Sequence, residues 1–502
     1  MNTLKGHHVL VLGLGLSGLA MARWCVRQGA QVTVADTRAQ PPQLATLRDS
    51  LADVAFVQSA FDTSLIEGSD FRAVFVSPGL TPRQTQDVVV AAQAMGLWVG
   101  GELSLFAQAL SELKETVHYR PHVLAITGTN GKTTVTSLTG HLMDWVERCV
   151  RVAGNIGPTL LDTLAQALQA QELPDVWVLE LSSFQLELSS SFAPTAATVL
   201  NLTQDHLDWH ENMADYARAK SHVFGGHSLM VLNRDDPQVM AMLPAPVKGR
   251  APREWLSFGA DMPQRPGDFG LEEVNGMVWL VRALEADETQ KKKRGADAEE
   301  LHFQRLMPAD ALRIRGRHNA SNALAALALC TSAGCALGPL LFGLREYRGE
   351  PHRVQPVGIL NGVEFFDDSK GTNVGATVAA LQGLGQERKV VVILGGEGKG
   401  QDFSPLADPV ARYARSVVLI GRDAPLIREA LLHSGVTLVE AVSMPEAVVL
   451  ANQRAHAGDA VLMSPACASF DMFDHYEHRA RVFCDAVRDL ALTTGNVLES
   501  AA

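Results

Sequence analysis

The sequence predicts an α/β protein made of three consecutive units, each built around a parallel β-sheet. At about 150 residues per domain, the 502 residues of the chain correspond to about three domains. The composition, 47% hydrophobic and 20% charged, is typical of globular proteins and argues against disordered or fibrous ones. Along the whole chain, short apolar runs rich in β-branched residues alternate with helical stretches, which is the pattern of βαβ units.

Charge and cysteine content narrow the class of protein. The net charge of -12 argues against a nucleic-acid-binding protein, which needs a basic surface. The six cysteines include no C-x-x-C pair, so neither a disulfide scaffold nor a zinc site is indicated. Residues 9–26 are apolar, but their glycines and Arg23 fit a strand, a turn and a helix better than a membrane span or a signal peptide. We expect a cytoplasmic protein with reduced thiols that binds neither nucleic acid nor a membrane.

The first unit is predicted to span residues 1–100. Its first strand, at 7–12, leads into GLGLSG, a G-x-G-x-x-G that would allow a tight turn and a close approach to a diphosphate. Asp36 ends a second strand at 31–36, where an acid that binds a ribose would lie. Three interpretations remain open from these residues alone. The turn could bind a dinucleotide such as NAD or FAD, another diphosphate such as a UDP-sugar, or no ligand.

The second unit, predicted over residues 101–349, contains TGTNGKTT between an apolar strand and a helix. This is the setting of a phosphate-binding loop, in which backbone N–H groups surround the phosphates. Lys132 would pair with the phosphate charge, and the Thr133 hydroxyl would ligate Mg²⁺. The full pattern has glycine where this chain has Ile126, which argues against GTPases and motor proteins. The loop predicts ATP binding, and further strands are expected at 177–184, 197–203 and 228–233.

Charged side chains follow the later strands of this unit. Glu180 and the pair Asp205 and His206 come where strands are expected to end, the edge at which α/β sheets bind ligands. Glu180 is a candidate Mg²⁺ ligand because this ion prefers oxygen donors beside substrate phosphates. The alternative for Glu180 and His206 is a structural role. Lys220, taken alone, reads as a lysine on the surface of a helix.

Two other segments of this unit, considered alone, are not predicted to bind a ligand or to take part in catalysis. Residues 285–300 (EADETQKKKRGADAEE) predict a solvated insertion loop, because such charge runs stay in water. Residues 317–330 predict a helix, capped by Asn319 or Ser321.

The third unit is predicted over residues 350–502. Its strands are expected within VEFFDDS, KVVVILGG, SVVLIG and AVLMSPA. Asp367, Asp368, Lys370, Lys399 and Ser469 all follow such runs. Two lysines and a hydroxyl at strand ends suit an anionic small molecule with more than one carboxylate.

Together these motifs resemble the Mur ligases, the ATP-dependent enzymes that add amino acids in peptidoglycan synthesis. The resemblance rests on GTNGKTT, GNIG (154–157), LELSSFQLE, DH-D around His206, GRHNASNALAA and PHR (351–353). GLGLSG with DTR (36–38), DDSKGTN, GGEGK and SPACASFD further resemble the branch that joins D-glutamate to UDP-N-acetylmuramoyl-L-alanine. The resemblance covers nearly the whole chain except the segment 285–300. It implies a Rossmann-like UDP-binding first domain, a P-loop ATPase-like central domain and a Rossmann-like C-terminal domain.

The resemblance also implies roles for individual residues, and it replaces the dinucleotide interpretation of GLGLSG. The UDP-sugar would contact Gly15, Leu16, Ser17, Asp36, Thr37, Arg38, Gly79, Asn155 and His206. ATP would contact Gly128, Thr129, Asn130, Gly131, Lys132, Thr133, Thr134, Asn319, Asn322, His352, Arg353 and Asp368. Two Mg²⁺ ions would be held by Thr133, Glu180, His206 and Lys220, with Lys220 carrying a carbamate made from CO₂. Catalysis would fall to Lys132, His206, Lys220 and Arg353. D-glutamate would contact Lys370, Thr372, Lys399, Ser469, Phe470 and Tyr476, where the family pattern has Leu and Phe at the last two positions.

The implied reaction forms an amide through an acyl phosphate, in a monomer whose C-terminal domain closes over the central one. Other ligases of the same superfamily are the nearest alternative, but they should lack DSKGTN or the N-terminal glycine-rich domain. An NAD-dependent dehydrogenase fused to an ATPase would respond to NADH and need no UDP-sugar. A nucleotide-sensing protein that is not an enzyme would bind ATP without turnover.

Overall fold

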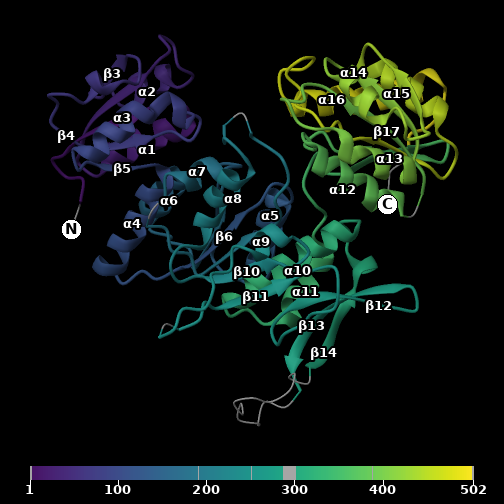
Figure 1. Cartoon of the computed structure of the whole chain (residues 1–502), viewed down its shortest axis with the longest axis horizontal. Helices are drawn as coiled ribbons and strands as arrows, with labels where there is room; N and C mark the ends of the chain where they lie inside the picture. Colours follow the sequence, from purple (N-terminus) through teal and green to yellow (C-terminus); the bar gives the residue numbers. More distant parts are fainter. Residues whose placement is uncertain are drawn as a thin grey trace.

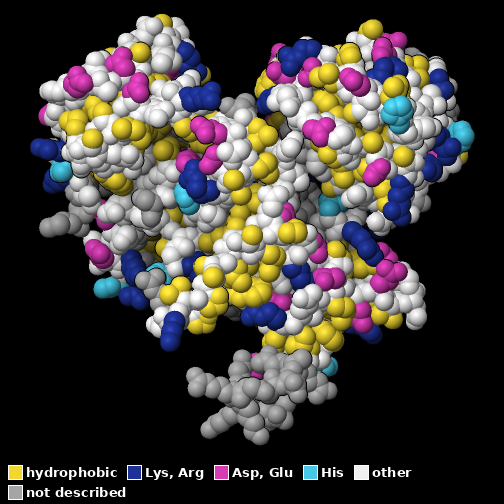
Figure 2. Space-filling view, in the orientation of Figure 1, with side chains coloured by type: hydrophobic (Ala, Val, Ile, Leu, Met, Phe, Trp, Pro, Cys, Tyr) yellow, Lys and Arg dark blue, Asp and Glu magenta, His cyan; other side chains and the backbone are white. Residues whose placement is uncertain are grey.

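The computed structural model describes residues 3–189, 191–207, 209–249, 251–286, 301–386 and 388–499. It contains three parallel or mostly parallel sheets that follow one another along the chain, so the predicted fold class is confirmed. The N-terminal and C-terminal lobes lie at the upper left and upper right of Figure 1, and the central lobe lies below them. Figure 2 shows a notch between the two upper lobes.

The N-terminal lobe is built on a five-stranded parallel sheet in the order β3-β2-β1-β4-β5. Its strands are β1 His8–Leu12, β2 Gln31–Asp36, β3 Ala55–Gln58, β4 Phe71–Val76 and β5 Trp98–Gly100. Its helices are α1 Leu16–Arg27, α2 Leu44–Ser50 and α3 Pro82–Ala94, and α4 Glu102–Thr116 follows. Helices α1 and α4 both pack against a helix of the central lobe, α6 Leu160–Ala170, so one hydrophobic core runs from the first lobe into the second.

The central lobe holds a six-stranded parallel sheet in the order β11-β10-β9-β6-β8-β7. The strands are β6 His122–Thr127, β7 Val150–Gly154, β8 Val176–Glu180, β9 Ala196–Val199, β10 Leu229–Asn233 and β11 Trp255–Phe258. The remaining helices are α5 Lys132–Trp145, α7 Ser183–Glu187, α8 Met213–Ser221, α9 Pro237–Met240, α10 Arg317–Ser332 and α11 Leu337–Glu346. The α5 and α10 helices pack together against this sheet and form a second core.

The predicted cap of α10 is wrong. The N-cap is Gly316, whose φ of 95° a residue with a side chain rarely adopts, so Asn319 and Ser321 lie inside the helix. The Asn319 side chain instead donates a hydrogen bond to the carbonyl of Arg315 (2.8 Å) and accepts one from Asn322 (3.1 Å).

An antiparallel sheet that the motifs did not predict extends from the central lobe. It consists of β12 Phe269–Val274, β13 Met277–Glu285 and β14 Leu301–Pro308, in sequence order. These strands lie at the lower right of Figure 1. The charged segment predicted as a loop falls between β13 and β14, and its residues 287–300 lie outside the described residues.

The C-terminal lobe has a six-stranded sheet in the order β15-β16-β20-β17-β18-β19, parallel except for the β15–β16 pair. Its strands are β15 Gln355–Leu360, β16 Val363–Asp367, β17 Val390–Gly395, β18 Ala414–Ile420, β19 Thr437–Glu440 and β20 Ala460–Met463. Its helices are α12 Val374–Gly385, α13 Ala407–Tyr413, α14 Ala424–Leu431, α15 Met444–Arg454 and α16 Tyr476–Thr493. Among the described residues, no helix is both long and apolar enough to cross a lipid bilayer.

Candidate active site

The predicted phosphate-binding loop connects β6 to α5. Gly131 caps α5 with a φ of 83°, and a Cβ atom there would lie 2.7 Å from Oδ1 of Asn322, so only glycine fits without displacement. The Lys132 amine donates hydrogen bonds to the carbonyls of Gly128 (2.9 Å) and Thr129 (2.8 Å). Burial lowers the pKa of Lys132, although the nearby carboxylate of Glu180 opposes this effect. The loop therefore holds its lysine folded back on its own carbonyl groups.

Glu180 ends β8, beside this loop, and is only 1% exposed. Its Oε1 accepts a hydrogen bond from the side chain of Asn155 (2.9 Å), but its buried Oε2 has no hydrogen-bond partner among the described residues. A buried carboxylate oxygen without a donor fits a cation. No group of three His, Cys, Asp or Glu that could hold a metal occurs in the described part of the chain. The arrangement suits Mg²⁺, which is commonly held by one or two carboxylates together with substrate phosphates.

Lys220 on α8 is 1% exposed, so its interpretation as a surface lysine is wrong. Its amine donates to the carbonyl of Gly128 (2.9 Å) and to the hydroxyl of Thr127 (3.3 Å), and it lies 4.6 Å from the ring centroid of Tyr216. Burial, and then the charge of Lys132, lower the pKa of Lys220 well below its usual value. A lysine with a lowered pKa has a larger fraction of neutral, nucleophilic amine.

His206 follows β9 in a turn and has a φ of 54°. Its ring packs edge-on against Phe184, with the centroids 4.8 Å apart. Burial lowers the pKa of His206; the carboxylate of Asp205 opposes this, and the charges of Lys132 and Lys220 add to it. His206 is therefore held neutral near a cluster of cations, a state in which an imidazole nitrogen can accept a proton or bind a metal.

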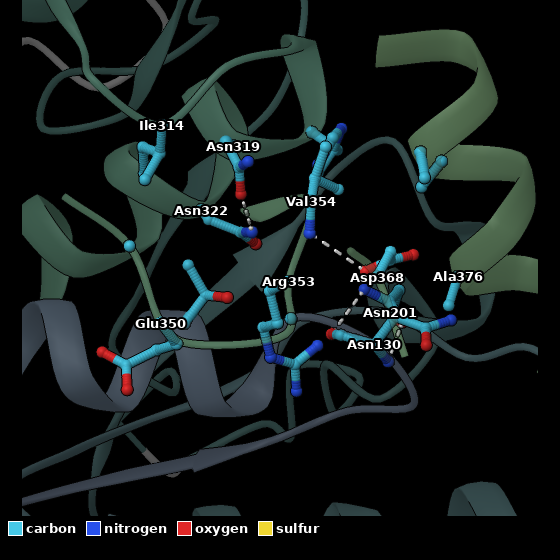
Figure 3. A pocket seen from close by; sticks show the side chains of 16 residues that line it. Asn130, Asn201, Ile314, Asn319, Asn322, Glu350, Arg353, Val354, Asp368 and Ala376 are labelled. Carbon is cyan, nitrogen blue, oxygen red and sulfur yellow. Dashed lines mark hydrogen bonds between the residues drawn. The ribbon is translucent and has the colours of Figure 1, made fainter. Parts of the chain in front are cut away.

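A pocket between the central and C-terminal lobes is lined by seven of the residues predicted to contact ATP: Asn130, Gly131, Thr134, Asn319, Asn322, Arg353 and Asp368. Figure 3 shows Asn319 and Asn322 of α10 on one wall, with Arg353 and Asp368 of the C-terminal lobe facing them. The pocket encloses about 700 Å³, including space open to solvent. Arg353 donates to the hydroxyl of Thr133 (2.9 Å), which joins the C-terminal lobe directly to the loop.

Asp367, which ends β16, and Asp368, which follows it, both have neighbours within hydrogen-bond distance. Burial raises the pKa of Asp368 to about 7, and its Oδ2 accepts a hydrogen bond from Ser464 (2.6 Å). The ring of His352 lies 2.7 Å from Oδ2 of Asp367, so this acid orients a residue predicted to contact ATP.

Some of the residues predicted to bind D-glutamate lie where the C-terminal lobe meets the central lobe. Thr372 and Lys399 line a second pocket together with Asp205 and His206 of the central lobe. Lys370 lies 5.6 Å from the ring centroid of Tyr476, and its pKa is lowered, chiefly by burial.

The rest of this group lies beside the second lysine. The Lys399 amine is 5.9 Å from the ring centroid of Phe470, which is 64% exposed, and Ser469 is buried. The aromatic residues that depart from the family pattern therefore lie over the two lysines.

The glycine-rich loop of the N-terminal lobe is held by Asp36. The carboxylate accepts hydrogen bonds from the Leu14 N–H (2.8 Å) and from the guanidinium of Arg38 (2.9 and 2.8 Å). Burial alone would raise the pKa of Asp36, but the hydrogen bonds and charge of Arg38 outweigh it and lower the pKa to about 2. Leu16 and Arg38 are exposed.

The structure keeps the N-terminal group of predicted residues apart from the others. Thr37 and Gly79 are exposed, Gly15 and Ser17 partly so, and all four lie in turns or first helical residues after strands. No hydrogen bond among the described residues joins this group to Asn155 or His206, the predicted contacts from the central lobe. The remaining predicted residues surround the boundary between the central and C-terminal lobes.

Sequence reasoning missed Glu102, which lies where the first two lobes meet. This acid begins α4, is 2% exposed and accepts a hydrogen bond from the Leu161 N–H (3.1 Å) at the start of α6. Burial raises its pKa to about 7, while hydrogen bonds from Leu161, Ser17 and Leu160 oppose this. It also missed Asn373, which is described below. Asn373 lies inside DDSKGTN, but for both residues only the folded structure shows the partners.

Comparison with known proteins assigns the family. Residues 7–101 match the domain family described as "Mur ligase MurD-like, N-terminal domain", residues 126–330 match "Mur ligase middle domain", and residues 352–467 match "Mur ligase, glutamate ligase domain". The chain belongs to the Mur ligase family. Mur ligases use ATP and Mg²⁺, and they join an amino acid or peptide to a UDP-sugar precursor of peptidoglycan.

The similarity to other Mur ligases extends over the whole chain. A protein of Albidiferax ferrireducens named UDP-N-acetylmuramoylalanine–D-glutamate ligase is 68% identical, with 100% of both chains covered. A protein of the same name from Polaromonas sp. is 56% identical, covering 99% of this chain and 100% of its own.

Solved structures of more distant ligases share the fold. A UDP-N-acetylmuramate–alanine ligase from Thermotoga maritima is 20% identical, with a TM-score of 0.53 and coverage of 96% of this chain and 99% of that one. A MurF ligase from Thermotoga maritima, solved in complex with ADP, is 16% identical, with a TM-score of 0.57 and coverage of 97% of each chain.

Proposed function

We propose that this Mur ligase adds D-glutamate to UDP-N-acetylmuramoyl-L-alanine. The observation that carries the proposal is the meeting of two groups of residues at one boundary. The phosphate-binding loop and Glu180 lie on the central side, and the pocket lined by Thr372 and Lys399 opens beside His206. The 68% identity to a protein named for this reaction supports the choice of substrates.

The proposed reaction begins with transfer of the γ-phosphoryl group of ATP to the terminal alanine carboxylate, which gives an acyl phosphate and ADP. The amine of D-glutamate then attacks the carbonyl carbon, loses a proton, and expels phosphate to leave an amide. Lys132 and Arg353 would neutralise phosphate charge during the first step, since positioning and electrostatics supply most of the catalysis in phosphoryl transfer. Lys370 and Lys399 would bind the carboxylates of D-glutamate.

The proposal includes two Mg²⁺ ions. Thr133 and Glu180 would hold one beside the phosphates, and His206 and Lys220 would hold the other, with Lys220 carrying a carbamate. When bound, Mg²⁺ would supply positive charge that neutralises the phosphate groups. The lowered pKa of buried Lys220 supports the carbamate, because only the neutral amine adds to CO₂. A ¹³C carbamate NMR signal that appears with labelled bicarbonate in the wild type, and not in Lys220→Met, tests it.

We also infer that the UDP moiety binds at GLGLSG, Asp36, Arg38 and Gly79. The exposed guanidinium of Arg38, held in place by Asp36, supports a contact with the uracil or diphosphate. The predicted domain limits of 1–100, 101–349 and 350–502 form part of the proposal. The proposal also includes a cytoplasmic location, which the six free cysteines support. It includes a monomeric state as well, which a light-scattering measurement of the molar mass tests.

The decisive experiment measures phosphate release from ATP and Mg²⁺ with UDP-N-acetylmuramoyl-L-alanine across a panel of amino acids. We expect release with D-glutamate only, together with a product heavier by one glutamyl residue by mass spectrometry. Release with a different amino acid would keep the ligase class and change the specificity. Folded protein that binds ATP but releases no phosphate with any amino acid would refute the proposal.

A further inference from the structure

Asn373 joins parts of the active site that belong to different lobes. It lies in DDSKGTN, directly after Thr372 and at the start of α12, and it is only 7% exposed. Asn373 is not among the residues predicted to contact ATP, the UDP-sugar or D-glutamate. A buried amide at such a position must satisfy its donors and its acceptor within the protein.

The orientation of the Asn373 amide is fixed by the helix that it caps. Its Oδ1 accepts a hydrogen bond from the Ala376 N–H (2.9 Å), as an N-cap residue does. The amide nitrogen therefore points away from α12 and toward the central lobe. There it donates to Oδ1 of Asn130 (3.2 Å) and to Oδ2 of Asp205 (3.3 Å). Both donors of the amide are used, and both cross the boundary between lobes.

The first of these acceptors belongs to the phosphate-binding loop. Within the central lobe, Asn201 holds only the backbone of Asn130, through bonds to its N–H (2.8 Å) and from the Asn201 amide to its carbonyl (3.0 Å). The side chain of Asn130 is held between Thr203 (3.3 Å) and Asn373. The side chain of this loop residue is thus held from both lobes, by Thr203 of the central lobe and by Asn373 of the C-terminal lobe.

The second acceptor leads to His206. Oδ1 of Asp205 accepts the backbone N–H of His206 (3.0 Å), and its Oδ2 lies 3.7 Å from Nε2 of the imidazole. Through Asp205, the Asn373 amide therefore also helps to position the turn that contains His206. Its chain neighbour Thr372 lines the pocket in which His206 lies.

The first turn of α12 lies close against these same residues. A Cβ atom added to Gly375 would lie 2.9 Å from Nδ2 of Asn130 and 2.9 Å from Oγ1 of Thr203. No side chain fits between the helix and the loop, so the two surfaces are in direct contact. A small displacement of α12 would break both hydrogen bonds of the Asn373 amide.

We propose that Asn373 is a positioning residue that couples the amino-acid pocket of the C-terminal lobe to the phosphate-binding loop of the central lobe. This inference rests on the proposed function, because it assumes that the two sites take part in one reaction. The loop and the attacking amine are aligned only while α12 is docked on Asn130 and Asp205. The coupling acts on the rate of the reaction more than on the binding of either substrate alone.

Two substitutions separate this role from the stability of α12. Asn373→Ser keeps a side-chain acceptor at the N-cap and removes the amide N–H groups that reach Asn130 and Asp205. Asn373→Asp also keeps the cap, and its negative charge is favourable at the positive N-terminal end of the helix dipole. The same charge lies against the carboxylate of Asp205 and repels it. We expect kcat to fall about tenfold in the first variant and about 100-fold in the second, as expected for the loss of buried hydrogen bonds, one of them to a charged group. Both KM for the UDP-sugar and the ATP Kd should stay within about threefold of the wild-type values.

Ser443→Ala is the matched control, because Ser443 caps α15 in the same lobe and is not among the residues placed at the site. It should lower the melting temperature without changing kcat. Hydrogen exchange supplies a readout that needs no turnover. Residues 127–133 and 203–207 should exchange faster in Asn373→Ser than in the wild type, and not in Ser443→Ala.

The coupling and the proposed function can fail separately. If the wild type shows no D-glutamate-dependent phosphate release, the proposed function fails, and the exchange experiment still decides whether Asn373 holds the loop. Unchanged exchange in the loop of Asn373→Ser would overturn the inference. So would folded Asn373→Ser and Asn373→Asp that keep kcat within twofold of the wild type, or a kcat loss that only parallels the fall in melting temperature.

Discussion

The buried carboxyl of Glu102 should make the protein less stable as pH rises, and Glu102→Gln should remove this loss. Its pKa is raised from 4.5 to about 7 by burial, despite hydrogen bonds that favour the charged form. Below pH 4.5 both the folded and the unfolded states carry the proton. Between pH 4.5 and 7 the unfolded state ionises while the folded state keeps its proton, so stability falls as pH rises.

The size of this effect follows from the same pKa. At about 1.4 kcal/mol per pH unit, the rise to about 7 corresponds to about 3 kcal/mol of stability lost by pH 8. Glutamine has nearly the same shape, keeps an acceptor for the Leu161 N–H and does not ionise. The melting temperature of Glu102→Gln, relative to the wild type, should therefore rise between pH 4.5 and 8 by about 6–12 °C if the unit unfolds cooperatively.

The assay is thermal unfolding followed by circular dichroism at closely spaced pH values. Glu115→Gln is the control, because Glu115 lies on the same helix and is exposed, and it should show no such change. The difference between variant and wild type is the quantity to follow, since it cancels the titration of all other groups. A difference that is flat with pH, or that falls toward pH 8, would refute the reasoning.

Three other predictions concern the substrates. Gly131→Ala would strain a φ of 83° and bring Cβ to 2.7 Å from Asn322, so calorimetry should show ATP-analogue binding weakened about tenfold, and an unchanged Kd would contradict the loop geometry. Arg38→Ala should raise KM for the UDP-sugar about tenfold and leave the ATP Kd unchanged; equal effects on both substrates would argue against a local role. Glu180→Gln should lower kcat about 100-fold and raise the Mg²⁺ concentration needed for half-maximal activity, and a variant with wild-type Mg²⁺ dependence would exclude Glu180 as a ligand.

Local patterns were sufficient for the fold class and for most strands of the three large sheets. The runs before GLGLSG, TGTNGKTT and DDSKGTN became β1, β6 and β16, because strands buried on both faces read as continuous apolar segments. The antiparallel sheet β12–β14 was not predicted. Its strands are partly exposed, and their mixed sequence carries little periodic signal.

The candidate site likewise has parts that local sequence patterns predict and parts that they do not. The motif TGTNGKTT predicted a phosphate-binding loop because its chemistry is local to eight consecutive residues. Lys220 could be judged buried only through the family resemblance, since its helix looks like any other that carries charged residues. Glu102 and Asn373 depend on partners far away in the sequence, and a single sequence contains no signal for such pairs. The prediction of a side-chain cap for α10 was wrong because the N-cap position is a glycine with a positive φ.

The antiparallel sheet also offers a practical attachment point. The ends of β13 and β14, where Glu285 pairs with Leu301, lie near the bottom of Figure 1, whereas α12 and the rest of the C-terminal lobe lie above them. His302, Phe303 and Gln304 on β14 are exposed, so the backbone there has room for added chain. A fluorescent protein or affinity tag spliced between these strands would report on lobe movement from a fixed reference without touching either terminus. The same position would let the enzyme be tethered to a surface with its substrate pockets facing solution.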